Sequence, residues 1–398
     1  EYRSRCDEAA RLTAAWCGWP INPGSEQQLK AWLYGVDGLP PQTNRASKSK
    51  VSVDDDAIAA LRQRYSLPFD PDDEERHPPT VDTALDRVLA GGHGVLEGRA
   101  IYARSKQLTA HYLEPLAGRA RVYPRTAIHT QANGRWSTTE PPLAQLPESL
   151  RDIIQPDTGT AWVGWDWEAI EPRLLRGYAR SRFLADVFEK GLDLHTIGLC
   201  DVMGWKYPSD LCRPHADSAW VEAHQWQGKD DKRRRLAKVI RYKKYYGGND
   251  ASDIPGIHLL QLPKARLKHA GELILTSDPD LRVWMRQTSA SVAKNPTVRD
   301  FTGARRTLLG SKGQAAAREA LNFPMQRGVQ SIANLAAIAI KQAVPDAIYA
   351  WSMHDSQQWQ VSLERLEAVL ATIQAIVERA VTVNGIEIAL PAKFVVTR

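Results

Sequence analysis

The chain has 398 residues, of which 43% are hydrophobic and 25% are charged, and its formal net charge is +6. These fractions are typical of globular proteins and exclude a chain that is disordered throughout. No apolar run approaches the roughly 18 residues that a membrane span needs, and the first residues do not resemble a secretory signal peptide. The four cysteines are too few and too scattered for a disulfide scaffold, which indicates a protein of a reducing compartment.

The N-terminal part of the chain is predicted to be mostly helical. We expect helices at 2–16 and 53–65, another helix that begins at Ser25, and a long helical stretch at 83–116 that glycines interrupt at 91–94. The segments 39–52 and 68–79 are polar or rich in proline, and we expect irregular structure in both.

After residue 119 the pattern changes to a mixture of strands and helices. Strands are expected at 120–123 and 160–167, a hairpin at 348–362 that turns at His354-Asp355, and a short strand at the C-terminus. Helices are expected at 185–189, 193–203, 233–246, 312–342 and 363–383, and an inserted loop at 207–228. The sequence therefore predicts an α+β fold with helices inserted between the parts of a central sheet.

Asp166 stands at the end of the apolar strand predicted at 160–167, just before a helix whose first turn contains Pro172. A carboxylate in this place is suited to hold a cation. The alternative interpretation is a carboxylate that caps the helix N-terminus.

Positive charge is concentrated at 229–244, where nine Lys or Arg residues meet only two acidic ones. Within this run Arg234, Lys238, Tyr242 and Tyr246 recur every four residues and form one stripe along a helix. Two cations followed by two aromatic rings suit a nucleoside triphosphate. The alternative is a solvated basic helix whose tyrosines pack into a core.

Arg318, Asn322 and Gln326 form a second stripe, also with a spacing of four residues. A guanidinium and two amides on one helix face can read acceptor groups in a DNA groove, and a solvated polar face is the alternative. Asp355 at the predicted hairpin turn has its own ordinary interpretation as a turn residue.

Four features occur in this order along the chain: Asp166, the stripe at 234–246, the stripe at 318–326 and Asp355. Together they resemble the motifs of the DNA polymerase I family (family A). The segment 166–173 is similar to motif A, 234–247 to motif B, 318–326 to the helix before motif C, and 354–356 to motif C. Weaker similarities lie at 134–137, 193–195 and 303–306.

The resemblance implies a right-hand polymerase fold, with a palm that contains an antiparallel sheet and with helical fingers and thumb. Residues 1–118 would be the thumb and its connection, 119–181 and 298–398 the two parts of the palm, and 182–297 the fingers.

It also implies the roles of individual residues. Asp166, Asp355 and the carbonyl of Trp167 would hold two Mg²⁺ ions, for which Mn²⁺ is a possible substitute. Arg234 and Lys238 would neutralise the triphosphate, Lys238 would also donate a proton to pyrophosphate, and His195 would bind the nucleotide. Tyr242 would lie against the sugar, Tyr246 beside the templating base, and Glu171 would exclude a ribose 2′-hydroxyl. The residues implied to contact DNA are Lys106, Arg135, Arg318, Asn322, Gln326 and His354.

The chain departs from the family pattern in three places. Ser356 replaces the glutamate that usually follows Asp355, and Glu168 replaces a usual serine. The insertion at 207–228 contains Cys212, His215 and His224, but their spacing fits no standard zinc pattern, so we interpret it as a surface insertion.

The resemblance implies template-directed DNA synthesis on a primer 3′-hydroxyl, with pyrophosphate released and without a proofreading exonuclease in this chain. The expected partners are primer–template DNA and deoxynucleoside triphosphates, and we expect a monomer in the cytoplasm of a bacterium or a phage-infected cell. Two alternatives are a catalytically impaired protein that binds primer–template, which Ser356 favours, and a metal-dependent nuclease, which leaves the stripe at 234–246 unexplained.

Overall fold

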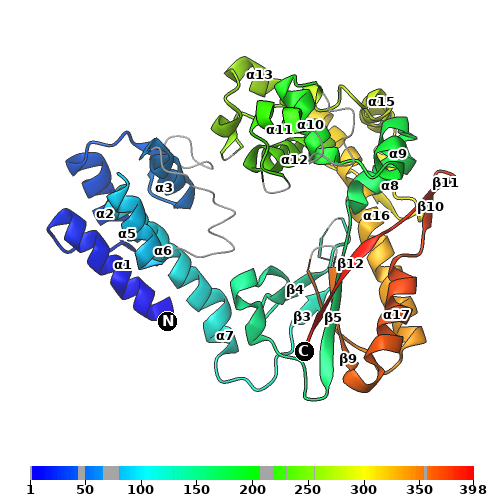
Figure 1. Cartoon of the computed structure of the whole chain (residues 1–398), viewed down its shortest axis with the longest axis horizontal. Coiled ribbons are helices and arrows are strands. Elements are labelled where there is room, and N and C mark those ends of the chain that lie inside the picture. The colour runs from blue at the N-terminus through cyan, green and yellow to red at the C-terminus, as the bar shows by residue number, and fades with distance from the viewer. Residues whose placement is uncertain are drawn as a thin grey trace. The chain divides into compact units, whose positions relative to one another are not determined.

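The structure is a computed structural model (Figure 1) that describes residues 2–43, 50–65, 80–128, 130–131, 133–206, 218–228, 231–254, 256–353 and 356–398. The chain divides into two compact units. Unit 1 comprises 1–125 and 138–154, and unit 2 comprises 126–137 and 155–398. Within the described ranges, no helix is both long enough and apolar enough to cross a membrane.

Unit 1 is built from helices that surround a small apolar core. Its longest helices, α1 and α6, pack against each other, and α6 continues through a π-helical segment, Thr109–Leu113, into α7. The elements are α1 (Tyr2–Cys17), α2 (Glu26–Lys30), a π-helical segment (Ala31–Val36), β1 (Gln42–Thr43), β2 (Val51–Ser52), α3 (Asp55–Arg62), α5 (Val81–Leu89), α6 (Gly94–Leu108) and α7 (Glu114–Leu116).

Most helix predictions for unit 1 are confirmed. Ser25 caps α2 by accepting a hydrogen bond from the backbone of Gln28, and Thr80 caps α5 in the same way. The predicted strand at 120–123 is wrong, because these residues have no regular structure and a strand, β3, forms only at Arg125–Ala127. Tyr123 is 76% exposed, so the segment has no apolar side to bury in a sheet. The next strand, β4, is Ser137–Thr139.

Unit 2 contains a four-stranded antiparallel sheet with the order β12-β5-β9-β8. Its strands are β5 (Thr160–Trp167), β8 (Ile348–Met353), β9 (Ser356–Ser362) and β12 (Ala392–Thr397). Alternate residues of β5, such as Val163 and Trp165, face a core that the sheet shares with residues of helices α16 and α17. The other face of β5 carries Asp166, which is exposed. We call this second face the open face of the sheet.

A second apolar core of unit 2 is formed mainly by helices between residues 175 and 285. The helices of unit 2 are α8 (Ile170–Ala179), α9 (Arg182–Glu189), α10 (Leu194–Met203), α11 (Ser218–His224), α12 (Lys232–Tyr245), α13 (Lys264–Lys268), α14 (Ala270–Leu273), α15 (Pro279–Lys294), α16 (Gly313–Ala343) and α17 (Leu366–Val377). Two short hairpins complete the unit, β6 (Thr297–Arg299) with β7 (Arg305–Thr307), and β10 (Val381–Val383) with β11 (Ile386–Ile388).

The mixture of helices and antiparallel sheet confirms the predicted α+β class, and the predicted strand at 160–167 matches β5. Two predictions need correction. The helix expected at 363–383 ends at Val377, because the chain turns into the β10–β11 hairpin. Residues 207–217 of the inserted loop expected at 207–228, with Cys212 and His215, lie outside the described residues, and the described remainder contains α11, whose Trp220 is buried. Burial of that indole against the helical core gives the segment a reason to fold.

Candidate active site

Asp166 is the last residue but one of β5, and its carboxylate lies on the open face of the sheet. The neighbouring Trp167 is buried in the opposite direction, where its indole nitrogen donates a hydrogen bond to the carbonyl of Val377 (3.0 Å). This anchor fixes the end of the strand and leaves the Asp166 carboxylate accessible. An exposed carboxylate on a rigid strand is an oxygen donor of the kind that Mg²⁺ prefers.

The hairpin β8–β9 lies beside β5 and carries the second predicted group. His354 and Asp355 lie outside the described residues. Ser356 begins β9, and its hydroxyl donates a hydrogen bond to the carbonyl of Met353 (2.9 Å). In the described part of the chain, no group of three or more His, Cys, Asp or Glu side chains could hold a metal ion by itself.

Glu168 forms an ion pair that the sequence did not predict. Its carboxylate lies 3.4 Å from the ammonium of Lys393 on β12. Lys393 is the direct partner of Asp166 in the sheet, and directly opposed residues of antiparallel strands point to the same face. Lys393 therefore adds a positive charge to the open face beside Asp166.

Glu171 lies in the first turn of α8 and is only 5% exposed. The hydroxyl of Tyr246, at the end of α12, donates to its two carboxylate oxygens at 2.8 and 2.7 Å. The guanidinium of Arg135 lies 3.7 Å from the same carboxylate. Burial, and next the Glu171 carboxylate, raise the pKa of Tyr246, so its hydroxyl stays protonated and remains a donor. The structure thus brings together three residues that the sequence predicted separately.

Three residues of the predicted stripe, Arg234, Lys238 and Tyr242, lie on one helix, α12, and the fourth, Tyr246, is its C-cap. The guanidinium of Arg234 forms a bidentate ion pair with Asp193, with nitrogen–oxygen distances of 2.6 and 2.9 Å. Burial alone would raise the pKa of the Asp193 carboxyl, but the Arg234 guanidinium holds it below its usual range. Lys238 is exposed, and its ammonium lies 5.9 Å from the ring centroid of Tyr242.

His195 lies in the first turn of α10, which Asp193 caps through the backbone of 195 and 196. Its ring centroid is 6.3 Å from that of Tyr242. Burial and next the charge of Arg241 lower the pKa of His195 to about 3. The imidazole is therefore neutral at pH 7 and can donate one hydrogen bond to an anion without adding charge.

Arg318, Asn322 and Gln326 all lie on α16, as predicted. The Gln326 amide oxygen accepts a hydrogen bond from Asn133 (2.9 Å), two residues before Arg135. Arg318 packs against Gly247, the residue after Tyr246, whose φ of +79° and lack of a side chain leave room for the arginine. These contacts connect α16 to the Glu171–Tyr246–Arg135 group.

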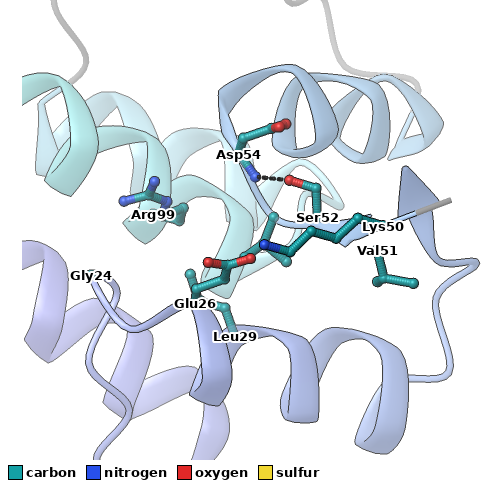
Figure 2. A pocket seen from close by; sticks show the side chains of 9 residues that line it. Gly24, Glu26, Leu29, Lys50, Val51, Ser52, Asp54 and Arg99 are labelled. Atoms are coloured by element: carbon teal, nitrogen blue, oxygen red, sulfur yellow. Dashed lines mark hydrogen bonds between the residues drawn. The ribbon is translucent and has the colours of Figure 1, made fainter. Parts of the chain in front are cut away.

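Lys106 belongs to unit 1, where it is exposed on α6 with its ammonium 5.8 Å from the ring centroid of Tyr102. The same unit contains a polar pocket of about 380 Å³ (Figure 2), and Lys106 does not line it. Glu26 and Asp54 in this pocket offset the charges of Lys50 and Arg99, so the pocket has no clear preference for an anion or a cation.

Three residues near the site were missed by sequence reasoning as functional candidates. They are Asp193, which pairs with Arg234; Asn133, which bonds Gln326; and Lys393, which stands opposite Asp166. Only Asp193 carried a local signal, because an aspartate just before a helix is a typical N-cap. The other two act across long sequence separations.

Comparison with known proteins gives matches over most of the chain. The model of DNA polymerase family A matches residues 70–397. Thermostable DNA polymerase I of Thermus thermophilus is 25% identical over 95% of this chain and 41% of its own length. DNA polymerase I of Pseudomonas aeruginosa is 24% identical over 92% of this chain and 37% of its own length. This chain thus spans about two fifths of these relatives.

Among solved structures, a similar one is described as the POL domain of Pol1 from M. smegmatis in complex with DNA primer-template and dNTP. The two structures superpose with a TM-score of 0.76 and are 21% identical in sequence. The match covers 100% of this chain and 64% of the M. smegmatis chain. This similarity confirms the predicted right-hand polymerase fold. Together with the match of the family model over most of the sequence, it leads to one conclusion: the chain belongs to DNA polymerase family A.

Proposed function

We propose that this chain is a DNA-directed DNA polymerase that adds deoxynucleotides to a primer 3′-hydroxyl and releases pyrophosphate. The observation that carries the proposal is the hydrogen bond from Tyr246 to Glu171, which joins the basic stripe of α12 to the helix that follows Asp166. The described residues proposed here to bind nucleotide or metal all belong to unit 2, which supports the proposal. Family membership and the complex described for the M. smegmatis structure support the same function.

In this proposal, Asp166, Asp355 and the carbonyl of Trp167 hold two Mg²⁺ ions, with Mn²⁺ as a possible substitute. The exposed Asp166 carboxylate fits such hard cations. When bound, the ions would supply activation of the primer 3′-hydroxyl and charge stabilisation at the leaving pyrophosphate. Lys393 lies on the same face as Asp166, so this side of the sheet is less negative than the carboxylates alone would make it.

The residues of α12 and α10 would bind the triphosphate. Lys238 is exposed and free to approach phosphate oxygens, and its ammonium can donate a proton to pyrophosphate as it leaves. Arg234 is held in a fixed orientation by Asp193, which preorganises its guanidinium. His195 would donate its remaining N–H as a neutral group, and Tyr242 would lie against the sugar.

Glu171 would select deoxyribose by occupying the space of a 2′-hydroxyl. Its buried position and its bonds from Tyr246 restrict its movement, which steric selection requires. Tyr246 would stand beside the templating base. Arg135, Arg318, Asn322 and Gln326 would contact the DNA minor groove, and His354 and Lys106 would contact the primer strand. In this proposal none of the 398 residues serves as a proofreading exonuclease.

We also propose that the chain acts as a monomer in the cytoplasm of a bacterium or a phage-infected cell, and that residues 1–118 are the thumb, 119–181 and 298–398 the palm, and 182–297 the fingers. A primer-extension assay with Mg²⁺ and all four deoxynucleotides tests the activity. Stepwise extension that follows the template is the expected result. Binding of primer–template without extension, in either Mg²⁺ or Mn²⁺, would instead favour a catalytically impaired DNA-binding protein, the alternative that Ser356 suggests.

A further inference from the structure

The core of the helical part of unit 2 contains a fully buried arginine. Arg241 on α12 is 0% exposed, although arginine is almost never fully buried unless it is paired. Its Nη2 donates to the carbonyl of Leu194 at 3.2 Å. Among the described residues, its Nε and Nη1 atoms are buried without a hydrogen-bond partner. Such a group is costly to bury, so its place in the core calls for a reason.

Two carboxylates lie near Arg241 without forming a direct pair with it. Asp201 accepts a hydrogen bond from Ser277 (2.8 Å). Asp278 accepts one from Ser181 and another from the backbone of Leu281 (both 3.0 Å). Both carboxylates interact with Arg241 only through their charge. The positive charge of Arg241 is therefore balanced at a distance, and its direct contacts are with the backbone of α10 and with the buried hydroxyl of Tyr245.

The neighbouring helix is shaped to admit this guanidinium. A side chain at Gly198 on α10 would place its Cβ 2.8 Å from Nη2 of Arg241. The carbonyl that Arg241 binds belongs to Leu194, which directly precedes His195. Lys238, three residues before Arg241, and Tyr242, directly after it, lie on adjoining faces of α12, and both belong to the stripe proposed to bind nucleotide. Arg241 thus connects α12, beside that stripe, to the turn that carries His195.

We propose that Arg241 is a positioning residue that fixes the first turn of α10 against α12 and thereby sets where His195 meets the triphosphate. This inference rests on the proposed function, namely that α10 and α12 together bind a nucleoside triphosphate. The charge of Arg241 would also disfavour a protonated imidazole. Three cations of α12 act on His195, namely Arg241, Arg234 and Lys238, whereas one anion, Asp193 at the start of α10, opposes them. His195 would then act as a neutral donor of fixed orientation.

The test compares Arg241→Met with His195→Gln and with the double variant in steady-state primer extension. Arg241→Met should raise the KM for deoxynucleotide roughly five- to tenfold, the effect of about one hydrogen bond, and leave kcat nearly unchanged. If Arg241 acts through His195, the double variant should have the KM of His195→Gln alone. Lys268→Met, which removes an exposed charge from α13, is the matched control and should leave KM unchanged.

Gly198→Ala provides a second variant that keeps both side chains. Its added methyl group would push against Nη2 of Arg241 and against Ile274, and it should raise KM in the same direction. Arg241→Lys should recover part of the loss. Unfolding curves and the affinity for primer–template show whether the variants remain folded, and a single cooperative unfolding transition with the affinity of the wild type is expected for each.

The outcomes separate the two proposals. A wild type that extends no primer would refute the proposed function and this inference with it. A wild type that extends normally, with Arg241→Met and Gly198→Ala unchanged in KM, would overturn only the role of Arg241. Additive effects of Arg241→Met and His195→Gln on KM would also overturn it. If Arg241 acts only through His195, replacing Arg241 should not change KM further once His195 has been replaced.

Discussion

The hydroxyl of Tyr246 donates to both carboxylate oxygens of Glu171, at 2.8 and 2.7 Å, across 75 residues of sequence. Tyr246 is the C-cap of the basic helix α12, and Glu171 lies in the first turn of α8. Because Arg135 approaches the same carboxylate, Glu171 is held from two sides. A carboxylate held in this way keeps one position and can restrict sterically what binds beside it.

Sugar selection should therefore depend on Glu171 and, more weakly, on Tyr246. Glu171→Ala should improve the incorporation of ribonucleotides relative to deoxynucleotides by about 10- to 100-fold, because it opens space for the 2′-hydroxyl. Tyr246→Phe keeps the carboxylate and should have a smaller effect in the same direction. Competition between the two nucleotide types in single-nucleotide extension measures both. Unchanged selectivity in Glu171→Ala would contradict the assignment.

Tyr242 should control the use of dideoxynucleotides. In the family, a tyrosine at this position goes with their acceptance, because its hydroxyl can replace the missing 3′-hydroxyl interaction. We expect efficient chain termination by the wild type and poorer termination after Tyr242→Phe. The ratio of terminated to full-length product, at fixed nucleotide ratios, gives the result. Equal termination by the two proteins would count against this placement of Tyr242.

Asp166→Ala and Asp355→Ala should each abolish extension. Affinity for primer–template should remain close to that of the wild type, because contacts with phosphates dominate DNA binding. Asp152→Ala, which removes a carboxylate outside the sheet, serves as the control and should extend normally. Gel-shift and extension assays on the same protein samples separate binding from chemistry. Near-normal extension by either active-site variant would refute the two-metal assignment.

The charges around Asp166 should set the requirement for divalent cations. Ser356→Glu adds a carboxylate and should lower the Mg²⁺ concentration for half-maximal extension. Glu168→Ala should raise it, because it leaves the Lys393 ammonium without its partner on the same face as Asp166. Lys393→Met removes that positive charge and should lower the Mg²⁺ concentration for half-maximal extension. The effects of Glu168→Ala and Lys393→Met should weaken at high salt, since the Glu168–Lys393 pair is exposed.

Metal titrations of extension, with Mg²⁺ and with Mn²⁺, measure these requirements directly. A wild type that is inactive with both metals, together with an active Ser356→Glu, would show that the natural chain is a binding protein. If the metal titrations of Glu168→Ala and Lys393→Met are both identical to that of the wild type, the pair lies too far from the ions to affect them.

Because of Asp201, the free energy of unfolding of the chain should decrease as the pH rises from about 4 to about 6. Burial is the main cause that raises the pKa of its carboxyl to about 6, against an ordinary value of 3.8. The folded state therefore binds more protons than the unfolded state in this range, so unfolding becomes easier as the pH rises. Asp201→Asn should raise the unfolding temperature at pH 7, and the difference from the wild type should vanish near pH 4.

The sequence predicted local features of the site well and contacts between segments poorly. The strand before Asp166, the stripe on α12 and the stripe on α16 depend on periodicity and on caps, which act over a few residues. By contrast, Asp193 pairs with Arg234 over 41 residues of sequence, and Lys393 lies opposite Asp166 only because β12 is a neighbour of β5. The burial of Arg241 could not be predicted either, because it belongs to a run of basic residues that is typical of a solvated helix face.

The order of strands in the sheet has a consequence for how the protein is made. Both neighbours of β5 come from the far end of the chain, and Trp162 pairs with Gln360, nearly 200 residues later. At ordinary rates of synthesis, the ribosome needs about 10 to 40 s to produce that length. During this time the apolar strand that carries Asp166 has neither edge covered, which makes it a target for chaperones and a point where aggregation begins. β5 is thus translated long before the sheet around it can assemble.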